Sequence, residues 1–341
     1  MKRIGQLFGT LLVFVGLLSA LTAWWVTQPL SLATPTVDIS IEPQTTVRGI
    51  AQVVADSGVD VEPVFLYGLF RLSGQSRKLR AGSYEIHDGD SPLNLLRKLS
   101  RGEESLKAVG LIDGWTFKQF RAALAKAPNL NHDSQGLSDA ELMARLGKPG
   151  VAPEGQFFPD TYTYGKGASE LRVMQRALNA MDKQLAAAWA QRDTSIILKT
   201  PEEALILASI VEKETGKESD RGMISSVFHN RLRINMPLQT DPTVIYGMGD
   251  AFDGNLRRAD LQSDHPWNTY TRKGLPPTPI AMPGRNALRA TLHPDTSKAL
   301  YFVARGDGSS AFSETLEAHN AAVNRYQRGA TSKPSTDAQA K

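Results

Sequence analysis

The sequence predicts an α+β protein with an N-terminal transmembrane helix, a small α+β module and then a larger mixed α+β domain. Three observations predict this organisation. Residues 4–26 carry no charge, segments with the two-residue period of strands alternate with segments of helical period, and 341 residues exceed one ordinary globular core. The hydrophobic content of 41% is sufficient for packed cores, which excludes a disordered chain.

The uncharged run over residues 4–26 follows Lys2 and Arg3. At about 1.5 Å per residue, a helix of this length spans the hydrocarbon core of a bilayer, and Trp24 and Trp25 lie where an aromatic belt forms. Because the cations precede the run, the positive-inside bias places the N-terminus in the cytoplasm and the rest of the chain outside it. We predict that residues 1–30 are a membrane anchor and the start of a stalk, in preference to a cleaved signal peptide, whose apolar region is normally shorter.

The small module is predicted over residues 37–104. Apolar and polar side chains alternate over residues 37–42, which is typical of a half-buried strand, and a second short strand is expected over 81–86. Thr46 can cap one helix and Pro63 can begin another, and a third helix follows the second strand. A module of this kind can also serve stability or dimerisation without binding any ligand.

The larger domain is predicted over residues 105–327. A capping box over 138–141 begins one helix, and the apolar stripe over 169–192 predicts a long amphipathic helix of the core. A strand over 301–304 and a last helix complete the domain. The final segment, 328–341, is polar and is predicted to be disordered.

Composition excludes several classes of function. The net charge is +4, and the body beyond the anchor is nearly neutral, so nucleic acid is not an expected partner. The absence of cysteine excludes thiol nucleophiles, disulfides and cysteine-ligated metals. The six histidines form no His-x-x-x-His pair, and the motifs of α/β-hydrolases and P-loop enzymes are missing. We therefore predict no metal and no cofactor.

A helix that begins at Thr200 carries the most informative residue. Thr200 is a suitable N-cap and is followed by proline and a capping-box glutamate. The apolar side of this helix is formed by Leu207, Ile210 and Val211. Glu214 falls on that side, whereas Glu212 points to the opposite side. Burial raises the pKa of a carboxyl group toward neutrality, as a general acid requires; the alternative is that Glu214 forms a salt bridge with a nearby arginine.

The chain beyond this helix is rich in neutral hydrogen-bonding side chains. Ser219 or Asp220 is expected to cap a second helix, which ends in a polar cluster, and residues 238–284 combine Asn, Gln, Thr and Tyr with proline turns. Such a composition can build a cleft for sugars. It can equally be a long structural connection whose prolines only fix its path.

Several blocks of the sequence resemble the YceG-like family of endolytic murein transglycosylases. The blocks are Glu154–Tyr162 (EGQFFPDTY), Ala208–Thr215 (ASIVEKET), Ser226–Leu232 (SVFHNRL), Leu238–Gly247 (LQTDPTVIYG) and Tyr270–Gly284. They occur in order between about residues 107 and 326. Three departures affect loops rather than the reaction class: Asp113 begins a block that more usually has Glu-Gly, and Thr278 and Met282 stand where Gly and Asn are expected.

The resemblance implies a specific function. It implies a LysM-like module over 37–104 and a YceG-like catalytic domain over 105–327, held in the bacterial inner membrane by a single span with the catalytic body in the periplasm. The reaction implied is non-hydrolytic cleavage of the β-1,4 bond between N-acetylmuramic acid (MurNAc) and N-acetylglucosamine (GlcNAc) within nascent peptidoglycan strands. The products carry 1,6-anhydro-MurNAc ends, and the cleavage helps to terminate glycan elongation. Peptidoglycan synthases are then candidate partners.

The resemblance also assigns site residues. Glu214 matches the catalytic glutamate of the family. Seven polar residues in the matching blocks flank its helix and are predicted to line the substrate cleft: Asn230, Gln239, Thr240, Asp241, Tyr246, Asn268 and Tyr270. An ordinary hydrolase acting on the same glycan is the nearest alternative. A non-catalytic, membrane-anchored glycan-binding scaffold of wall synthesis is the alternative from another class, although a scaffold helix has no reason to tolerate Glu214 on its buried side.

Overall fold

The computed structural model describes residues 2–215 and 217–328, without the side chains of residues 2–11 and 328. The predicted disordered tail, 328–341, lies outside the described residues apart from Arg328. The chain divides into two compact units. The first runs to Ala108 and also includes Pro128–Asn131 and Thr163–Ala168, and the second comprises the remainder from Val109. Nothing in the sequence pattern indicated that the two short segments belong with the first unit.

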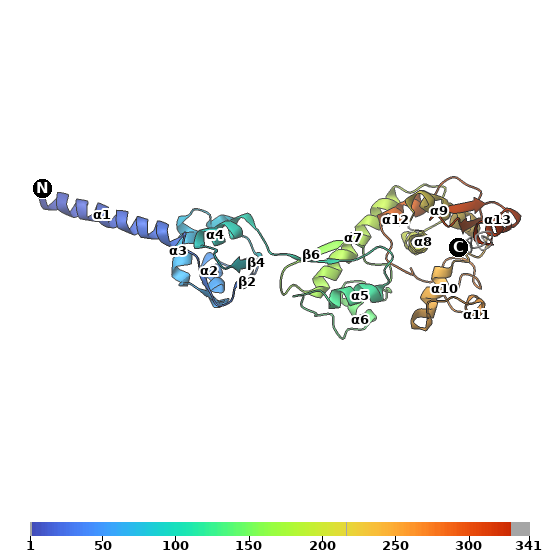
Figure 1. Cartoon of the computed structure of the whole chain (residues 1–341), viewed down its shortest axis with the longest axis horizontal. Coiled ribbons are helices and arrows are strands. Elements are labelled where there is room, and N and C mark those ends of the chain that lie inside the picture. The colour runs from blue at the N-terminus through green and yellow to red at the C-terminus, as the bar shows by residue number, and fades with distance from the viewer. Residues whose placement is uncertain (1, 216, 329–341) are drawn as a thin grey trace, which may run out of the picture. The chain divides into compact units, whose positions relative to one another are not determined.

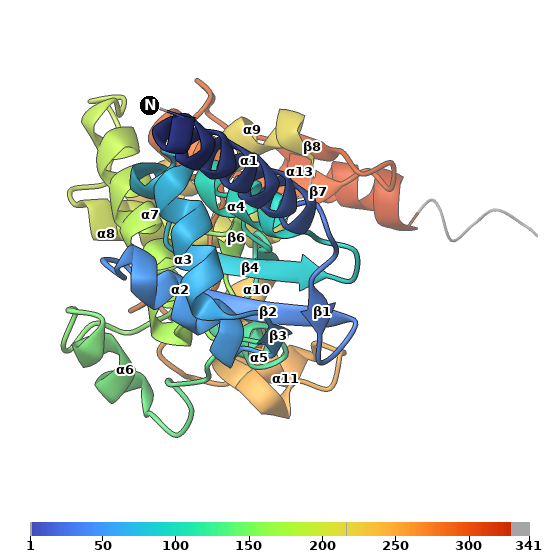
Figure 2. The same ribbon diagram turned by 90° about the vertical axis from the view of Figure 1, so that its left-hand side faces the viewer.

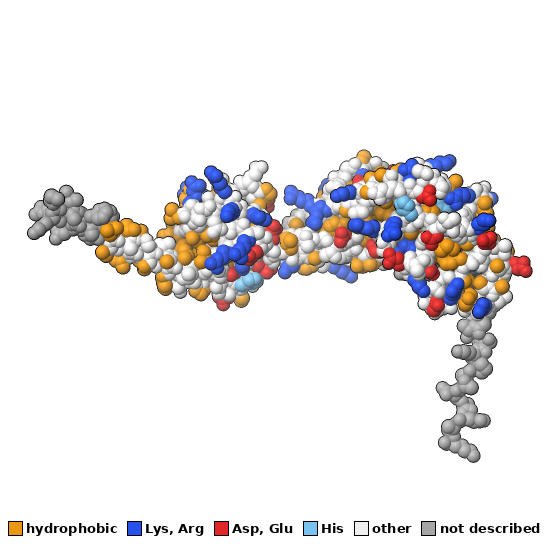
Figure 3. Space-filling view, turned by 90° about the horizontal axis from the view of Figure 1, so that it is seen from above, with side chains coloured by type: hydrophobic (Ala, Val, Ile, Leu, Met, Phe, Trp, Pro, Cys, Tyr) orange, Lys and Arg blue, Asp and Glu red, His pale blue; other side chains and the backbone are white. Residues whose placement is uncertain are grey.

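Helix α1, Lys2–Trp25, begins the described chain (Figure 1). Hydrophobic side chains are exposed along its described part (Figure 3), among them Leu17, Leu18 and Leu21. At its C-terminal end Trp25 contacts Phe65, with ring centroids 5.9 Å apart. Among the described residues, no helix is long and apolar enough to cross a membrane. The predicted anchor, 1–30, begins in the part whose side chains are not described.

The first unit is a small α+β module. Its elements are β1 (Ser31–Leu32), β2 (Thr36–Ile41), α2 (Val47–Asp56), β3 (Val59–Asp60), α3 (Pro63–Leu72), η1 (Ser76–Lys78), β4 (Gly82–His87) and α4 (Pro92–Arg101). Strands β2 and β4 lie side by side and antiparallel (Figure 2), with Thr36 opposite His87 and Ile41 opposite Gly82. The two strands predicted over 37–42 and 81–86 are therefore confirmed as one pair.

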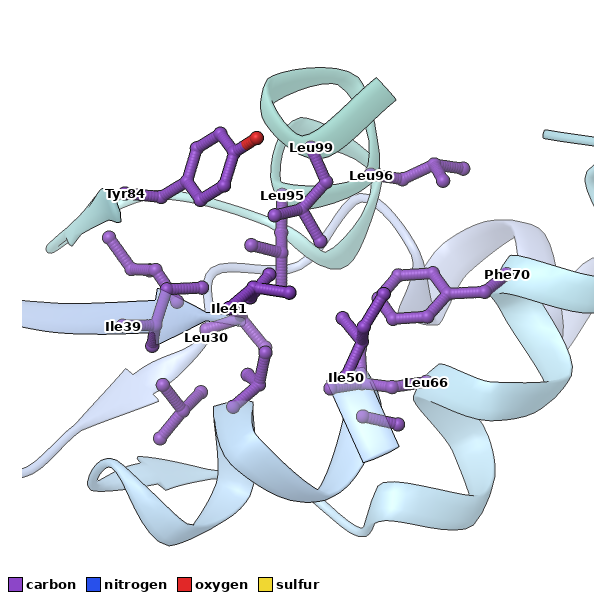
Figure 4. Packing of buried hydrophobic residues seen from close by; sticks show 14 of the residues in the cluster. Leu30, Ile39, Ile41, Ile50, Leu66, Phe70, Tyr84, Leu95, Leu96 and Leu99 are labelled. Atoms are coloured by element: carbon purple, nitrogen blue, oxygen red, sulfur yellow. The ribbon is translucent and has the colours of Figure 1, made fainter. Parts of the chain in front are cut away.

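One hydrophobic core holds this module together. Apolar side chains from β2, α2, α3, β4 and α4 point toward one another (Figure 4), and Ile39, Phe70 and Leu95 at its centre are almost completely buried. Thr46 caps α2 as predicted, since its hydroxyl accepts a hydrogen bond from Gly49 N at 3.1 Å. The amphipathic pattern of the sequence is thus sufficient to explain the core.

The second unit is larger and mainly helical. Its elements are β5 (Lys107–Gly110), α5 (Phe117–Ala125), α6 (Asp139–Arg145), β6 (Thr161–Tyr164), α7 (Glu170–Ala190), α8 (Pro201–Glu214), α9 (Glu218–Arg233), α10 (Asp241–Met248), η2 (Gly249–Ala251), α11 (Arg258–Gln262), α12 (Arg285–Leu292), β7 (Tyr301–Ala304), β8 (Ser310–Ser313), α13 (Leu316–Val323) and η3 (Asn324–Arg328). Strand β5 pairs with β6, and β7 pairs antiparallel with β8; the division between the units falls within both β5 and β6.

Helix α8 is the central element of this unit. It contacts α7, α9, α10 and α12 (Figure 1). Its first turn is as predicted, because the Thr200 hydroxyl accepts a hydrogen bond from Glu203 N at 3.2 Å. The buried surface is wider than the predicted stripe, since seven of its residues are buried: Ala204, Leu205, Leu207, Ala208, Ser209, Ile210 and Val211. A helix buried on nearly all sides can hold a polar group rigidly at its end.

One expectation for the following chain was wrong. Lys217, and not Ser219 or Asp220, precedes α9, and no side chain caps this helix. Asp220 lies inside the first turn instead, where its carboxylate accepts a hydrogen bond from Ser310 N at 2.6 Å. Within residues 238–284 the structure forms the short helices α10 and α11, and α12, which follows this region, packs against α8. Helices as short as α10 and α11 contain too few positions to show a clear helical period.

Candidate active site

Glu214 is the last residue of α8. The helix ends there because Thr215 adopts an extended backbone conformation, with φ −149° and ψ 134°. Oε1 of Glu214 accepts a hydrogen bond from the Thr240 hydroxyl. Burial raises the pKa of Glu214 to about 7; Asp241 adds to this effect, while the hydrogen bond from Thr240 and the charge of Arg231 oppose it. Both protonation states are therefore populated near neutral pH.

Thr240 is held firmly in its position. It is 2% exposed and is the N-cap residue of α10. Its backbone N–H donates to the Thr269 hydroxyl at 3.1 Å, and its carbonyl accepts from the Thr243 hydroxyl at 2.7 Å. The hydroxyl that contacts Glu214 thus comes from a residue whose backbone is fixed on both sides.

Asp241 and Tyr270 extend the Glu214 cluster. The Tyr270 hydroxyl donates to Oδ1 of Asp241 at 2.5 Å. Burial and the neighbouring Asp241 raise the pKa of Tyr270, so this hydroxyl remains protonated. The buried guanidinium of Arg231 donates to the carbonyls of Leu300 and Leu238 at 2.6 and 2.7 Å. The side-chain partner of Glu214 is therefore Thr240 and not an arginine, which answers the salt-bridge alternative.

Gln239 adjoins this cluster in an unusual conformation. Its φ is 48°, in the left-handed region, and it lies between the buried residues Leu238 and Thr240. Its backbone N–H donates to Thr269 O at 3.1 Å, while its side chain is exposed. Non-glycine residues seldom adopt this conformation without a tertiary reason, and such positions concentrate at functional sites.

Two of the predicted cleft residues hold backbone segments instead. The Asn230 amide donates to Ser297 O and Ala299 O, at 2.8 and 3.0 Å. Asn268 is fully buried; its amide donates to Ser263 O at 2.6 Å, and its Oδ1 accepts from Tyr270 N at 2.8 Å. The structure therefore brings Gln239, Thr240, Asp241 and Tyr270 together around Glu214, while these two asparagines shape the loops nearby.

The side chain of Glu212 is buried as well, which its predicted position on the side opposite the apolar stripe did not indicate. Its side chain is 8% exposed and pairs with Arg221 at 3.5 Å. Its carboxylate also accepts a hydrogen bond from Gly284 N at 2.9 Å, and Gly114 packs against it. The direction predicted by helical phasing is right, because Glu212 and Glu214 contact different groups. The sequence pattern could not show this burial, because loops distant in sequence cover the second side of α8.

The buried carboxyl group of Glu154 was not predicted as part of a site. Glu154 is 6% exposed, and its two oxygens accept the N–H of Phe117 at 3.0 and 3.2 Å. The hydroxyl of Tyr246, a predicted cleft residue, lies close enough to lower the pKa of this carboxyl group, although burial outweighs the effect. Burial raises the pKa of Glu154 to about 7. Glu154 lies in a loop, where no helical or strand period marks a residue as buried. The only sequence signal for its role was its position in a block that resembles the family.

Glu154 and Tyr246 line a cavity of about 990 Å³. Trp267, Lys213 and Pro242 also belong to the lining. Glu214 does not, but its sequence neighbour Lys213 does, so the cavity adjoins the Glu214 cluster. Within the described residues, no group of three or more His, Asp or Glu side chains could hold a metal ion.

Comparison with known proteins places this geometry in context. A family model described as the YceG-like family matches residues 39–325. A Bacillus subtilis (strain 168) protein named endolytic murein transglycosylase is 31% identical over 313 residues, which cover 85% of each chain. A Streptococcus pneumoniae (serotype 2, strain D39) protein of the same name is 27% identical over 318 residues; the match covers 83% of this chain and 57% of the pneumococcal one.

A solved structure agrees with the sequence comparison. The crystal structure of a yceG-like protein from Listeria monocytogenes superimposes with a TM-score of 0.54 at 29% identity, covering 85% of this chain and 99% of the Listeria chain. The family match begins at residue 39 within the first unit, continues through the second unit to residue 325 and includes every residue of the Glu214 cluster. The chain therefore belongs to the YceG-like family.

Proposed function

We propose that the protein is an endolytic peptidoglycan lytic transglycosylase. It cleaves the β-1,4 bond between MurNAc and GlcNAc within nascent glycan strands, leaves 1,6-anhydro-MurNAc ends and so helps to terminate glycan elongation. The observation that carries this proposal is the half-buried carboxyl group of Glu214, which the Thr240 hydroxyl holds and whose pKa is about 7. The relatives named endolytic murein transglycosylase supply the substrate class.

In the proposed reaction one carboxyl group acts twice. Protonated Glu214 donates its proton to the glycosidic oxygen as the bond from that oxygen to C1 of MurNAc breaks. The resulting carboxylate then accepts the proton of the C6 hydroxyl, whose oxygen forms a new bond to C1. No water is consumed, and Glu214 ends protonated as it began. Ordinary glycosidases divide these tasks between two carboxyl groups at a set separation.

The surrounding residues support this double role. A pKa of about 7 lets Glu214 exchange a proton in both directions at neutral pH. The Thr240 hydroxyl stabilises the carboxylate that forms after the first transfer. Asp241 bears a negative charge near the centre that becomes cationic at C1, while its bond to Tyr270 fixes its orientation.

We also propose where the protein acts. Helix α1 is a single-pass anchor in the cell inner membrane, with the N-terminus in the cytoplasm and the catalytic body, residues 105–327, in the periplasm. The uncharged run over 4–26 and the charges that precede it support this arrangement. The module over 37–104 is LysM-like, and peptidoglycan synthases are the partners that fit an enzyme acting on nascent strands.

Product analysis tests the proposed reaction. Purified, uncrosslinked glycan strands are incubated with the full-length chain in detergent, and the new ends are identified by mass spectrometry. We expect internal cleavage and ends that are lighter than the hydrolysed product by one water. Reducing ends would instead identify a hydrolase, and binding without any cleavage would identify a glycan-binding scaffold.

A further inference from the structure

The cavity beside the Glu214 cluster has no role in the reaction proposed above. Lys213, the residue before Glu214, and Pro242, the residue after Asp241, both belong to its lining. Its wall is therefore within one residue of the reacting groups. An enzyme that cuts inside a polymer must hold sugars on both sides of the broken bond, so at least one sugar site has to adjoin the acid.

Two aromatic side chains form part of the cavity wall. Tyr246 and Trp267 meet edge to face, with ring centroids 5.5 Å apart and an interplanar angle of 66°. The indole N–H of Trp267 donates to the Thr278 hydroxyl at 3.0 Å, which fixes the ring. Both side chains are partly exposed. The faces of pyranose rings carry C–H groups that pack well against such aromatic surfaces.

Glu154 interacts with the aromatic wall. Its buried carboxyl group accepts the N–H of Phe117 on α5 and interacts electrostatically with the Tyr246 hydroxyl. Tyr246 therefore faces a carboxyl group that α5 holds in place. Because the ring is already ordered, little conformational entropy is lost when a ligand packs against it.

The charges of the cavity largely neutralise one another. Lys118 pairs with Asp250 at 2.5 Å, and Arg121 pairs with Asp139 at 3.7 Å. Lys213 donates to a backbone carbonyl at 3.2 Å. A site for a polyanion would present cations that are not already paired across its own rim. The lining therefore favours an uncharged ligand, and its neutral polar groups suit hydroxyl and acetamido substituents.

We infer that this cavity is a sugar-binding subsite for an N-acetylated hexosamine of the glycan strand, with Trp267 and Tyr246 as its platform and Glu154 as the residue that positions Tyr246. The identity of the strand rests on the proposed function. The subsite itself rests on the cavity, the ordered aromatic pair and the paired charges.

Direct binding tests the inference. The full-length chain in detergent carries Glu214→Gln, so that the probe is not turned over, and is titrated by calorimetry with the β-1,4-linked tetramer of GlcNAc. We expect Trp267→Ala to raise the Kd at least about 10-fold, because the main apolar contact is lost. Trp267→Phe keeps an aromatic face and should stay within about threefold of the parent.

Trp189→Ala is the matched control. Trp189 lies on α7, stacks with Arg192 and does not line the cavity, so this variant should bind like the parent. The inference is overturned if the parent does not bind the tetramer, or if folded Trp267→Ala binds it as tightly as the parent. An equal loss of affinity in Trp189→Ala would overturn it as well. If Trp267→Ala does not fold, tryptophan emission decides the matter: the tetramer must change the emission of the parent and not that of Trp267→Phe.

The two proposals fail in different ways. If the unmodified chain produces anhydro ends but tetramer binding is indifferent to Trp267, the subsite is wrong and the proposed function stands. If binding depends on Trp267 but no anhydro ends form, the subsite stands and the proposed reaction is wrong.

Discussion

The Thr240 hydroxyl donates a hydrogen bond to Oε1 of Glu214, and this contact joins the end of α8 to the start of α10. The hydrogen bond favours the ionised carboxylate, whereas burial favours the protonated form. Burial has the larger effect and raises the pKa of Glu214, whereas the hydrogen bond limits the rise. The resulting pKa is about 7. A residue that must first donate a proton and then accept one is best served by this balance.

Glu214→Gln should abolish most of the activity. The amide keeps the shape of the side chain but can neither donate nor accept the transferred proton, so the rate on purified glycan strands should fall at least ~10²- to 10⁴-fold. Glu202→Gln is the matched control, because Glu202 is exposed in the first turn of the same helix and should tolerate the change. Equal activity of the two variants would remove Glu214 from the mechanism.

The stability of the protein should depend on pH through Glu214. Its pKa is about 7 in the folded chain and near 4.5 in the unfolded chain, so the folded state binds more protons between these values. The contribution of the protonated form is therefore present at pH 5 and lost as the pH rises toward 8. Glu214→Gln removes this dependence, and relative to the unmodified protein it should gain up to about 3 kcal/mol between pH 5 and 8. Urea unfolding at the two pH values measures the difference, and a constant difference would contradict the raised pKa.

Local sequence signals predicted the parts of the site that lie on long, regular elements. Thr200 and Pro201 mark the start of α8, and from that start the period of 3.6 residues places Glu214 and Glu212 on different sides. The hydrogen bond from Thr240 could not be predicted in this way. It depends on where α10 packs against α8, which is a contact between segments 26 residues apart.

Loops carry the features that the sequence pattern did not reveal. Glu154 becomes a buried acceptor only because α5 directs the N–H of Phe117 at it from 37 residues away. Asn268 has the composition of a cleft residue, but folding uses its amide to hold Ser263 and Tyr270. The same polar types therefore serve the substrate or the backbone, and only tertiary contacts distinguish these uses.

Glu212→Gln should weaken folding and spare the chemistry. The substitution removes the charge that Arg221 faces in a buried pair, while the amide oxygen can still accept from Gly284 N. We expect a loss of about 1–3 kcal/mol in the free energy of unfolding. Below the unfolding transition, kcat should be close to that of the unmodified chain. An inactive but folded Glu212→Gln would mean that the roles of Glu212 and Glu214 are reversed.

Glu154→Ala should destabilise the second unit. It leaves the buried N–H of Phe117 without its acceptor, which costs about 1–3 kcal/mol, and it removes the carboxyl group that interacts with the Tyr246 hydroxyl. Glu154→Gln retains an acceptor oxygen and should lose less. Urea unfolding at pH 7 compares the stability of the two variants with that of the unmodified protein. If Glu154→Ala were as stable as Glu154→Gln, these hydrogen bonds would not support the fold.

Gln239→Gly should separate stability from activity. Gln239 has a φ of 48°, a conformation that costs a non-glycine residue about 1–2 kcal/mol and costs glycine much less. Because glycine also loses more chain entropy on folding, the net gain in unfolding free energy should be at most about 1 kcal/mol. The exposed amide beside the Glu214 cluster is lost, so the KM for glycan strands should rise about 3- to 10-fold, as expected for one neutral hydrogen bond.

Asn235→Gly is the matched control, since Asn235 is also exposed with a φ of 54° but follows α9 outside the cluster. A rise in KM confined to Gln239→Gly would show that the strained backbone presents a substrate contact, whereas equal behaviour of the two variants would make the conformation a matter of chain path alone.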